Sequence, residues 1–199
     1  MFAYLPRATR GLILANVVAY VLQLLTHDAF TGLLALQPLG PDFHLWQVVT
    51  YAFLHASVAH IFFNMFALFM FGPELERYWG SARFLVLYFA SVLAAAAAQL
   101  ATNYLSGTGA TTIGASGGIF GLLLAFGFYF PRQRLMLLFP PIPMPAWLFV
   151  TLYGLLELLL GVTRTEAGVA HFAHLGGMAG AALVILYWRS RDRALRPPW

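Results

Sequence analysis

Six apolar stretches dominate this chain, and they restrict it to folds that a lipid bilayer can hold. A helix that crosses the hydrocarbon core needs about 20 mostly apolar residues, and each stretch has this length or is slightly shorter. We expect an all-α membrane protein whose 199 residues form a single transmembrane domain. The predicted spans lie at roughly 9–25, 58–78, 83–101, 115–130, 146–162 and 169–188.

The composition also indicates a protein that lies in the lipid bilayer. Hydrophobic residues make up 61% of the chain and charged residues only 9%, whereas a soluble domain carries about 25% charged residues. The chain has no cysteine, so neither disulfides nor thiolate chemistry is available to it. The first apolar stretch lacks a small-residue cleavage site after a short core, so we interpret it as a retained helix and not as a signal peptide.

The basic residues orient the predicted bundle. All eleven are arginine, and short cytoplasmic loops collect Lys and Arg. If the N-terminus is cytoplasmic, Arg164 alone falls on the outer side. The ten on the inner side are Arg7, Arg10, Arg77, Arg83, Arg132, Arg134, Arg189, Arg191, Arg193 and Arg196. We predict a multi-pass protein with both termini in the cytoplasm, in a prokaryotic plasma membrane or, as the alternative, an organelle membrane. No basic stripe follows any one element, so no nucleic-acid partner is expected.

Two segments between the spans are unusual. Residues 28–56 are apolar but contain several Gly and Pro residues, which predicts short interfacial helices anchored by Trp46 and Tyr51. Residues 139–147, "FPPIPMPAW", are proline-rich, so this connector cannot be a continuous helix.

Polar side chains gather at a similar depth near the outer ends of the second, fourth and sixth predicted spans. They are His60, Asn64, Ser116, His171 and His174. Polar residues inside a bilayer are functional candidates by default. A serine becomes a nucleophile when a histidine takes its proton, and backbone N–H groups or a side-chain amide can stabilise the resulting oxyanion. Several histidines near one face also leave haem binding open as an alternative.

Small residues surround the serine. Gly114 with Gly118, and Gly117 with Gly121, have the GxxxG spacing, and "HLGGMAGA" offers a second small face on the sixth span. Such faces let helices in lipid approach closely, which argues for tight packing and against a roomy haem cavity. "GASGG" also matches the nucleophile elbow of soluble hydrolases. We reject that interpretation, because no buried strand precedes the serine.

Four motifs together resemble the rhomboid family of intramembrane serine proteases. They are "HASVAHIFFN" at 55–64, "GPELERYWG" at 72–80, "GASGG" at 114–118 and "AHLGG" at 173–177. The resemblance covers nearly the whole chain. It implies a six-transmembrane-helix bundle with a long membrane-associated first loop. It also implies a serine-type endopeptidase that cleaves transmembrane segments of membrane proteins without a metal or other cofactor.

The same resemblance assigns roles to individual residues. It makes Ser116 the nucleophile and His174 the general base of a dyad that has no orienting acid. His174 fits better than His171, because only His174 has a glycine three residues later. The oxyanion side comprises His60, Asn64 and the backbone N–H of Ser116. The supporting positions are Phe120, which packs against the base, and Gly114, Gly117 and Gly177.

Some features depart from the family pattern or stay open. The first loop reads Trp46-Gln47, where the family often carries Trp-Arg. We expect His55 and His171 to be structural. Glu157 is expected to be a hydrogen-bonded or snorkelling carboxyl, or else to help open the bundle to substrate.

The alternative function is a catalytically silent rhomboid-like protein that binds membrane helices. Silent relatives lose the serine or the histidine, however, and this chain keeps both. The partners expected are transmembrane substrates and lipids, with the physiological substrate and oligomeric state left open.

Overall fold

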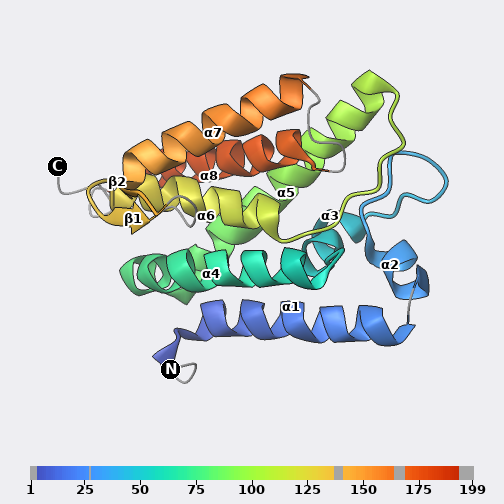
Figure 1. Ribbon diagram of the computed structural model, residues 1–199, viewed down its shortest axis with the longest axis horizontal. Helices are drawn as coiled ribbons and strands as arrows, with labels where there is room; N and C mark the ends of the chain where they lie inside the picture. Colours follow the sequence, from blue (N-terminus) through green and yellow to red (C-terminus); the bar gives the residue numbers. More distant parts are fainter. Residues whose placement is uncertain (1–3, 27, 137–140, 164–168, 193–199) are drawn as a thin grey trace.

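The computed structural model describes residues 4–26, 28–136, 141–163 and 169–192. Its elements are helices α1 (Arg7–Thr26), α2 (Asp28–Leu34), α3 (Gln47–Thr50), the 3-10 helix η2 (Tyr51–Phe53), α4 (Val58–Trp79), α5 (Ser81–Ser106), α6 (Ser116–Tyr129), α7 (Ala146–Thr163) and α8 (His171–Arg191), with strands β1 (Arg134–Met136) and β2 (Pro143–Pro145). The long helices run side by side as a bundle (Figure 1). The predicted all-α membrane fold is confirmed.

Six helices of this bundle are apolar. Five of them, α1, α4, α5, α7 and α8, are long and apolar enough to cross a membrane, and α6 is a shorter apolar helix. The largest difference from the predicted bounds is in α5, which continues past residue 101 to Ser106. Its polar end is stabilised by side-chain hydrogen bonds, such as the one from Gln99 to Asn103. The helix stops at Gly107, whose φ of 67° is the left-handed conformation that ends many helices.

Helix α6 lies at the centre, with α4 on one side and α7 and α8 on the other (Figure 1). Nearly all of its residues are buried. A helix that is apolar on every face is typical of such a position. Its Phe126 belongs to the same hydrophobic cluster as the buried aromatic side chains Phe84 and Tyr88 of α5. The element that begins at Ser116 is therefore the most enclosed of the bundle's helices.

The first loop folds into α2, α3 and η2, but Tyr51 does not anchor it at the interface. Its side chain is buried, and its hydroxyl donates a hydrogen bond to the backbone oxygen of Val92 in α5 at 2.8 Å. The backbone oxygen of Tyr51 accepts from Gly114 N at 2.9 Å. The predicted interfacial role is wrong, because this residue instead ties the loop to the bundle. Trp46 is half exposed, and its indole N–H donates to Leu33 O.

Gln47 stabilises the loop through a neutral side chain. It is fully buried. Its Oε1 accepts hydrogen bonds from the backbone N–H groups of Gln37 and His44, and its Nε2 donates to the backbone oxygens of Leu33 and Asp42. Four bonds from one amide connect segments on both sides of the loop. Gln47 thus braces the loop without an ion pair.

The proline-rich connector contains a structure that the sequence analysis did not predict. Pro143–Pro145 pairs antiparallel with Arg134–Met136 in a two-stranded sheet, and α7 begins at the next residue. Residues 137–140 lie outside the described part. Proline has no backbone N–H, which suits such a short edge pairing better than a helix interior.

The described arginines belong to segments at one end of the molecule. The start of α1, the end of α4, the β1–β2 sheet and the end of α8 all lie there (Figure 1). At this end Arg83 forms an ion pair with Asp192 at 2.7 Å. Arg164, Arg193 and Arg196 lie outside the described residues. Which side of the membrane this end faces stays a prediction.

A buried carboxylate fastens α1 to the bundle at this same end. Glu76 in α4 is 3% exposed. It accepts hydrogen bonds from the backbone N–H groups of Ala8 and Thr9 at 2.8 and 2.7 Å, from the Thr9 hydroxyl at 2.8 Å and from the Ser81 hydroxyl at 2.6 Å. The first N–H groups of a helix have no partners within it. The negative charge of Glu76 therefore caps α1 from a neighbouring helix.

Replacing this carboxylate should destabilise the fold. Glu76→Gln keeps the shape but leaves some of the four donors without an acceptor, which costs about 1–3 kcal/mol for an unsatisfied buried group. We expect a lower midpoint of thermal unfolding in detergent. Glu74→Gln is the matched control, because Glu74 is exposed and has only a 3.8 Å contact with Arg77. Equal midpoints for the two variants would contradict the capping role.

Candidate active site

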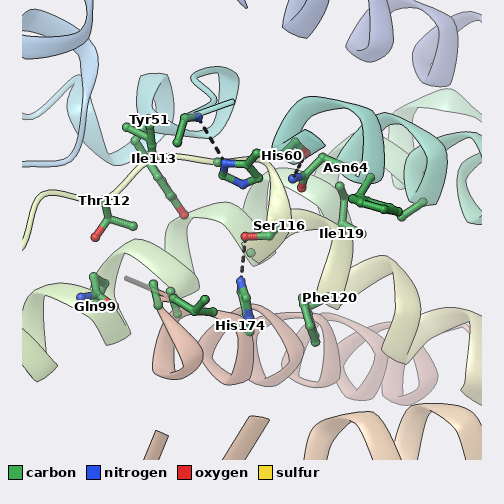
Figure 2. A pocket seen from close by; sticks show the side chains of 18 of the residues that line it. Tyr51, His60, Asn64, Gln99, Thr112, Ile113, Ser116, Ile119, Phe120 and His174 are labelled. Atoms are coloured by element: carbon green, nitrogen blue, oxygen red, sulfur yellow. Dashed lines mark hydrogen bonds between the residues drawn. The ribbon is translucent and has the colours of Figure 1, made fainter. Parts of the chain in front are cut away.

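Two helices bring a serine and a histidine into contact. Ser116 is the first residue of α6, and His174 lies in the first turn of α8. The Ser116 Oγ and the His174 Nε2 are 2.8 Å apart, across 58 positions of sequence (Figure 2). Ser116 is partly exposed and His174 is 9% exposed. This is the geometry in which an imidazole can accept a hydroxyl proton.

The contact depends on glycine at position 177. A Cβ atom on Gly177 would collide with the backbone carbonyl of Gly117 in α6. Gly117 is confined in turn, because a Cβ there would lie 2.5 Å from the Cβ of Ala95 in α5. Helices α6 and α8 therefore approach backbone to backbone directly after Ser116 in α6 and one turn after His174 in α8.

A second glycine shapes the turn before the serine. Gly114 has a φ of 130°, a conformation that other residues rarely adopt. A Cβ on it would lie 2.9 Å from the Nε2 of His60. The loop therefore passes directly against the His60 ring and delivers Ser116 to the same site.

The length of α6 indicates how deep the serine lies relative to the hydrocarbon core. Fourteen residues make a helix of about 21 Å, whereas the hydrocarbon core is about 30 Å thick. If the Tyr129 end of α6 lies at the membrane surface that carries the arginines, Ser116 lies within the hydrocarbon core, roughly 9 Å from its opposite boundary. Water must reach it through a cavity.

Such a cavity is present, with a volume of about 740 Å³. Ser116, His174, His60 and Asn64 all line it (Figure 2). Asn64 donates one hydrogen bond to the backbone oxygen of His60 at 2.8 Å, and its amide nitrogen carries a second hydrogen. The N–H groups in the first turn of α6 have no partners within the helix. Donors from α4 and α6 therefore border the space beside the serine.

Stacked aromatic rings fix the orientation of the His174 imidazole. The ring of Phe120 stacks on the imidazole of His174, with centroids 4.2 Å apart and planes 8° apart. Tyr153 of α7 stacks on Phe120 at 5.4 Å, and Phe149 on Tyr153 at 5.6 Å. This series of rings restricts rotation of the imidazole about its side-chain bonds.

An acid lies on the far side of the same imidazole. The Oε2 of Glu157 is 2.9 Å from the Nδ1 of His174 and 2.7 Å from the Nδ1 of His171. The expectation that no acid contacts the base is wrong, because α7 and α8 pack side by side here. A hydrogen-bonded Glu157 was expected, but its partner was not. The sequence signal was a lone carboxylate in an otherwise apolar helix.

Among the described residues, Glu157, His171 and His174 are the group best placed to hold a metal ion. Ligands of a tetrahedral zinc ion, each about 2.1 Å from the metal, lie roughly 3.4 Å from one another. The observed separations of 2.7 and 2.9 Å are those of hydrogen bonds. The spacing of these three residues therefore fits hydrogen bonds better than coordination of a shared metal ion. The expected absence of a metal stays a prediction.

His55 lies beside the site without contacting the serine. Its backbone N–H donates to Gln23 in α1 at 2.8 Å. Burial and, to a smaller extent, the neighbouring His60 lower the pKa of its imidazole to about 4, against the opposing effect of a hydrogen bond with the Phe53 backbone. His55 is therefore uncharged at neutral pH, which suits a buried bracing residue.

Known proteins share this sequence pattern. Residues 42–191 match the family model for the Rhomboid domain. RHOMBOID-like protein 12, mitochondrial, of Arabidopsis thaliana is 31% identical over 191 residues, which cover 87% of this chain and 56% of the plant protein. Rhomboid protein 1, mitochondrial, of Saccharomyces cerevisiae is 32% identical over 140 residues, 66% of this chain and 38% of the yeast protein. Rhomboid protease GlpG of Haemophilus influenzae is 33% identical over 157 residues, with coverages of 78% and 73%.

Enlarging Gly177 should separate the serine from the histidine. The added methyl group of Gly177→Ala meets backbone atoms, so α8 must shift, at an overpacking cost of about 1–3 kcal/mol. We expect slower reaction of Ser116 with a fluorophosphonate, measured as a second-order rate constant, together with a lower unfolding midpoint. Gly11→Ala is the control, because nothing lies within 4 Å of its added Cβ. A labelling rate for Gly177→Ala equal to that of Gly11→Ala would refute the argument.

Proposed function

Because this chain belongs to the rhomboid family, we propose that it is an intramembrane serine endopeptidase that cleaves transmembrane segments of other membrane proteins. It is an integral membrane protein. The observation that carries the proposal is the 2.8 Å contact between Ser116 Oγ and His174 Nε2 beside a cavity inside the helical bundle.

In the proposed mechanism Ser116 attacks the scissile carbonyl while His174 takes its proton. His174 then returns that proton to the leaving amine, and water hydrolyses the acyl-enzyme with the same histidine as base. The aromatic series that begins at Phe120 supports this role, because it keeps the imidazole pointed at the serine.

The oxyanion would be stabilised by donors on the other side of the serine. We assign this role to the backbone N–H of Ser116 and to the side chains of His60 and Asn64, which line the cavity. Loss of one such donor typically costs 10²–10³ in kcat, or about 2.7–4 kcal/mol. Several donors share the role here, so single losses should be smaller.

The cavity supports lateral entry of a substrate helix. Its lining includes Phe63 and Phe71 of α4 as well as Phe149 and Tyr153 of α7. These apolar side chains suit a transmembrane segment that approaches through the lipid past α7 or over the first loop. The relatives include mitochondrial proteins, so the prokaryotic plasma membrane, with cytoplasmic termini, stays a prediction.

The second candidate function is binding of membrane helices without cleavage. The same cavity would serve it, but it requires no contact between a serine and a histidine. The contact of Ser116 with His174 favours the protease.

Removal of the serine hydroxyl separates these two functions. Ser116→Ala should abolish cleavage of a single-span substrate in proteoliposomes and labelling by a fluorophosphonate, because the nucleophile is gone. Alanine suits the small-residue surroundings, so the unfolding midpoint should hardly change, and this serves as the folding control. Cleavage undiminished in Ser116→Ala would rule out this serine as the nucleophile.

The depth of the site predicts which substrates are cleaved. Every backbone group of a helix in lipid is already paired, so an intact helix resists attack. Substrates with Gly or Pro near the cleavage site should therefore react fastest, with a small residue just before the cut. The measurement compares a single-span substrate with a variant whose helix breakers are replaced by leucine, at matched expression and orientation. Equal cleavage rates would show that local unwinding does not limit the reaction.

A further inference from the structure

The mechanism proposed above leaves one buried acid unused. Glu157 is 6% exposed in α7, a helix that is otherwise apolar. A buried carboxylate is costly unless hydrogen bonds compensate for the lost water. One of its carboxylate oxygens, Oε2, forms two hydrogen bonds, and both are with histidines of α8. One of these histidines is the proposed base.

Counting protons fixes the state of this group. His174 Nε2 must carry a lone pair to accept the Ser116 proton, so the proton of a neutral ring lies on Nδ1. That Nδ1–H then donates to Glu157 Oε2, and His171 Nδ1–H donates to the same oxygen. A carboxylate accepts both bonds at once. A protonated Oε2 would instead donate to the Nδ1 of His171, and the proton of that ring would then lie on Nε2, a buried atom without a hydrogen-bond partner in the described structure. The contacts therefore favour an ionised Glu157 that accepts from both imidazoles.

We infer that Glu157 is a positioning residue for His174, so that the proposed pair acts as a Ser116–His174–Glu157 triad. The inference rests on the proposed function and departs from the dyad that the family resemblance implied. Glu157 holds the tautomer in which Nε2 faces the serine, and its charge stabilises the imidazolium formed during the reaction. It touches neither the substrate nor the serine.

The reaction balances without proton transfer to the acid. The Ser116 proton moves to His174 Nε2 while Oγ forms a bond to the substrate carbonyl carbon, and the carbonyl π pair moves to oxygen. The imidazolium keeps its Nδ1–H against the Glu157 carboxylate. When the oxyanion collapses, the C–N bond breaks and the Nε2 proton passes to the leaving amine, which restores the neutral ring.

His171 provides the internal comparison. Its Nδ1 contacts the same oxygen of Glu157, but the histidine that forms the hydrogen bond with Ser116 is His174. Both histidines link α8 to α7 through Glu157. Loss of Glu157 removes both of these bonds and loss of His171 removes one, so a purely structural role predicts losses of activity that follow the drops in unfolding midpoint. Only a positioning role predicts that Glu157 matters far more for the chemistry.

The kinetic test compares Glu157→Gln with His171→Ala in proteoliposomes. Loss of the acid in a soluble Ser-His-Asp protease lowers kcat by about 10⁴. We expect Glu157→Gln to lower kcat and the rate of fluorophosphonate labelling by about 10²–10⁴, with little change in KM. Glu157→Asp, which keeps the charge, should recover part of the loss, and His171→Ala should lose far less. Equal losses for Glu157→Gln and His171→Ala, matched by equal drops in unfolding midpoint, would overturn the inference.

A spectroscopic test reads the positioning directly. Two-bond ¹H–¹⁵N correlation spectra of ¹⁵N-histidine protein report the tautomer of each of the six histidines, and His174→Ala identifies the signal of the base. We expect His174 to be protonated at Nδ1 in the wild type and mixed in Glu157→Gln. An unchanged tautomer would overturn the inference, as would activity lost in EDTA and restored by Zn²⁺. This readout needs no catalysis, so it stands even if Ser116→Ala disproves the protease.

Discussion

The close approach of α6 and α8 against α5 is the constraint on which the site depends. Gly177 faces the Gly117 backbone, Gly121 faces Ser91, and Gly180 faces Ala94 and the backbone of α5. Lipid tails are as apolar as the helices, so close packing of small residues takes the place of the hydrophobic effect in joining them. The packing fixes the separation of two backbones, and this separation sets the distance between a hydroxyl and an imidazole. The serine and histidine thus meet through the geometry of glycines that have no chemistry of their own.

Two buried carboxylates organise opposite ends of the bundle. Glu76 gathers donors from α1 and α5 at the arginine-bearing end, and Glu157 gathers two imidazoles of α8 at the other. Each is an expensive group in an apolar setting, compensated only because its neighbours supply hydrogen bonds. In both cases the acid joins helices that side-chain packing alone would hold less specifically.

Much of the fold and of the candidate site followed from the sequence for identifiable reasons. The spans were predictable because nearly every residue of a helix in lipid is apolar, which hydropathy detects. Ser116 and His174 were predictable because polar residues are rare in such helices. Gly107 ended α5 later than predicted, because polar side chains near its end find partners within the helix. The burial of Tyr51 and the partners of Glu157 were missed for another reason: Val92 and His174, which these two residues contact, lie on distant elements. Hydropathy and charge indicate whether a residue lies in lipid, in water or in the protein interior. These contacts depend instead on which helices pack against each other.

The attachment of α1 has a consequence for how the chain is made. Protein synthesis delivers α1 before α4 and α5, yet the carboxylate that caps its start belongs to α4 and is itself held by Ser81, the first residue of α5. At its other end Gln23 bonds to Thr31 and to the backbone N–H of His55, which also come later. Helix α1 therefore waits in the membrane, with its polar groups unpaired by their final partners, until two further spans have emerged. Helix α1 is synthesised before the α4–α5 pair, and yet it cannot dock before that pair exists.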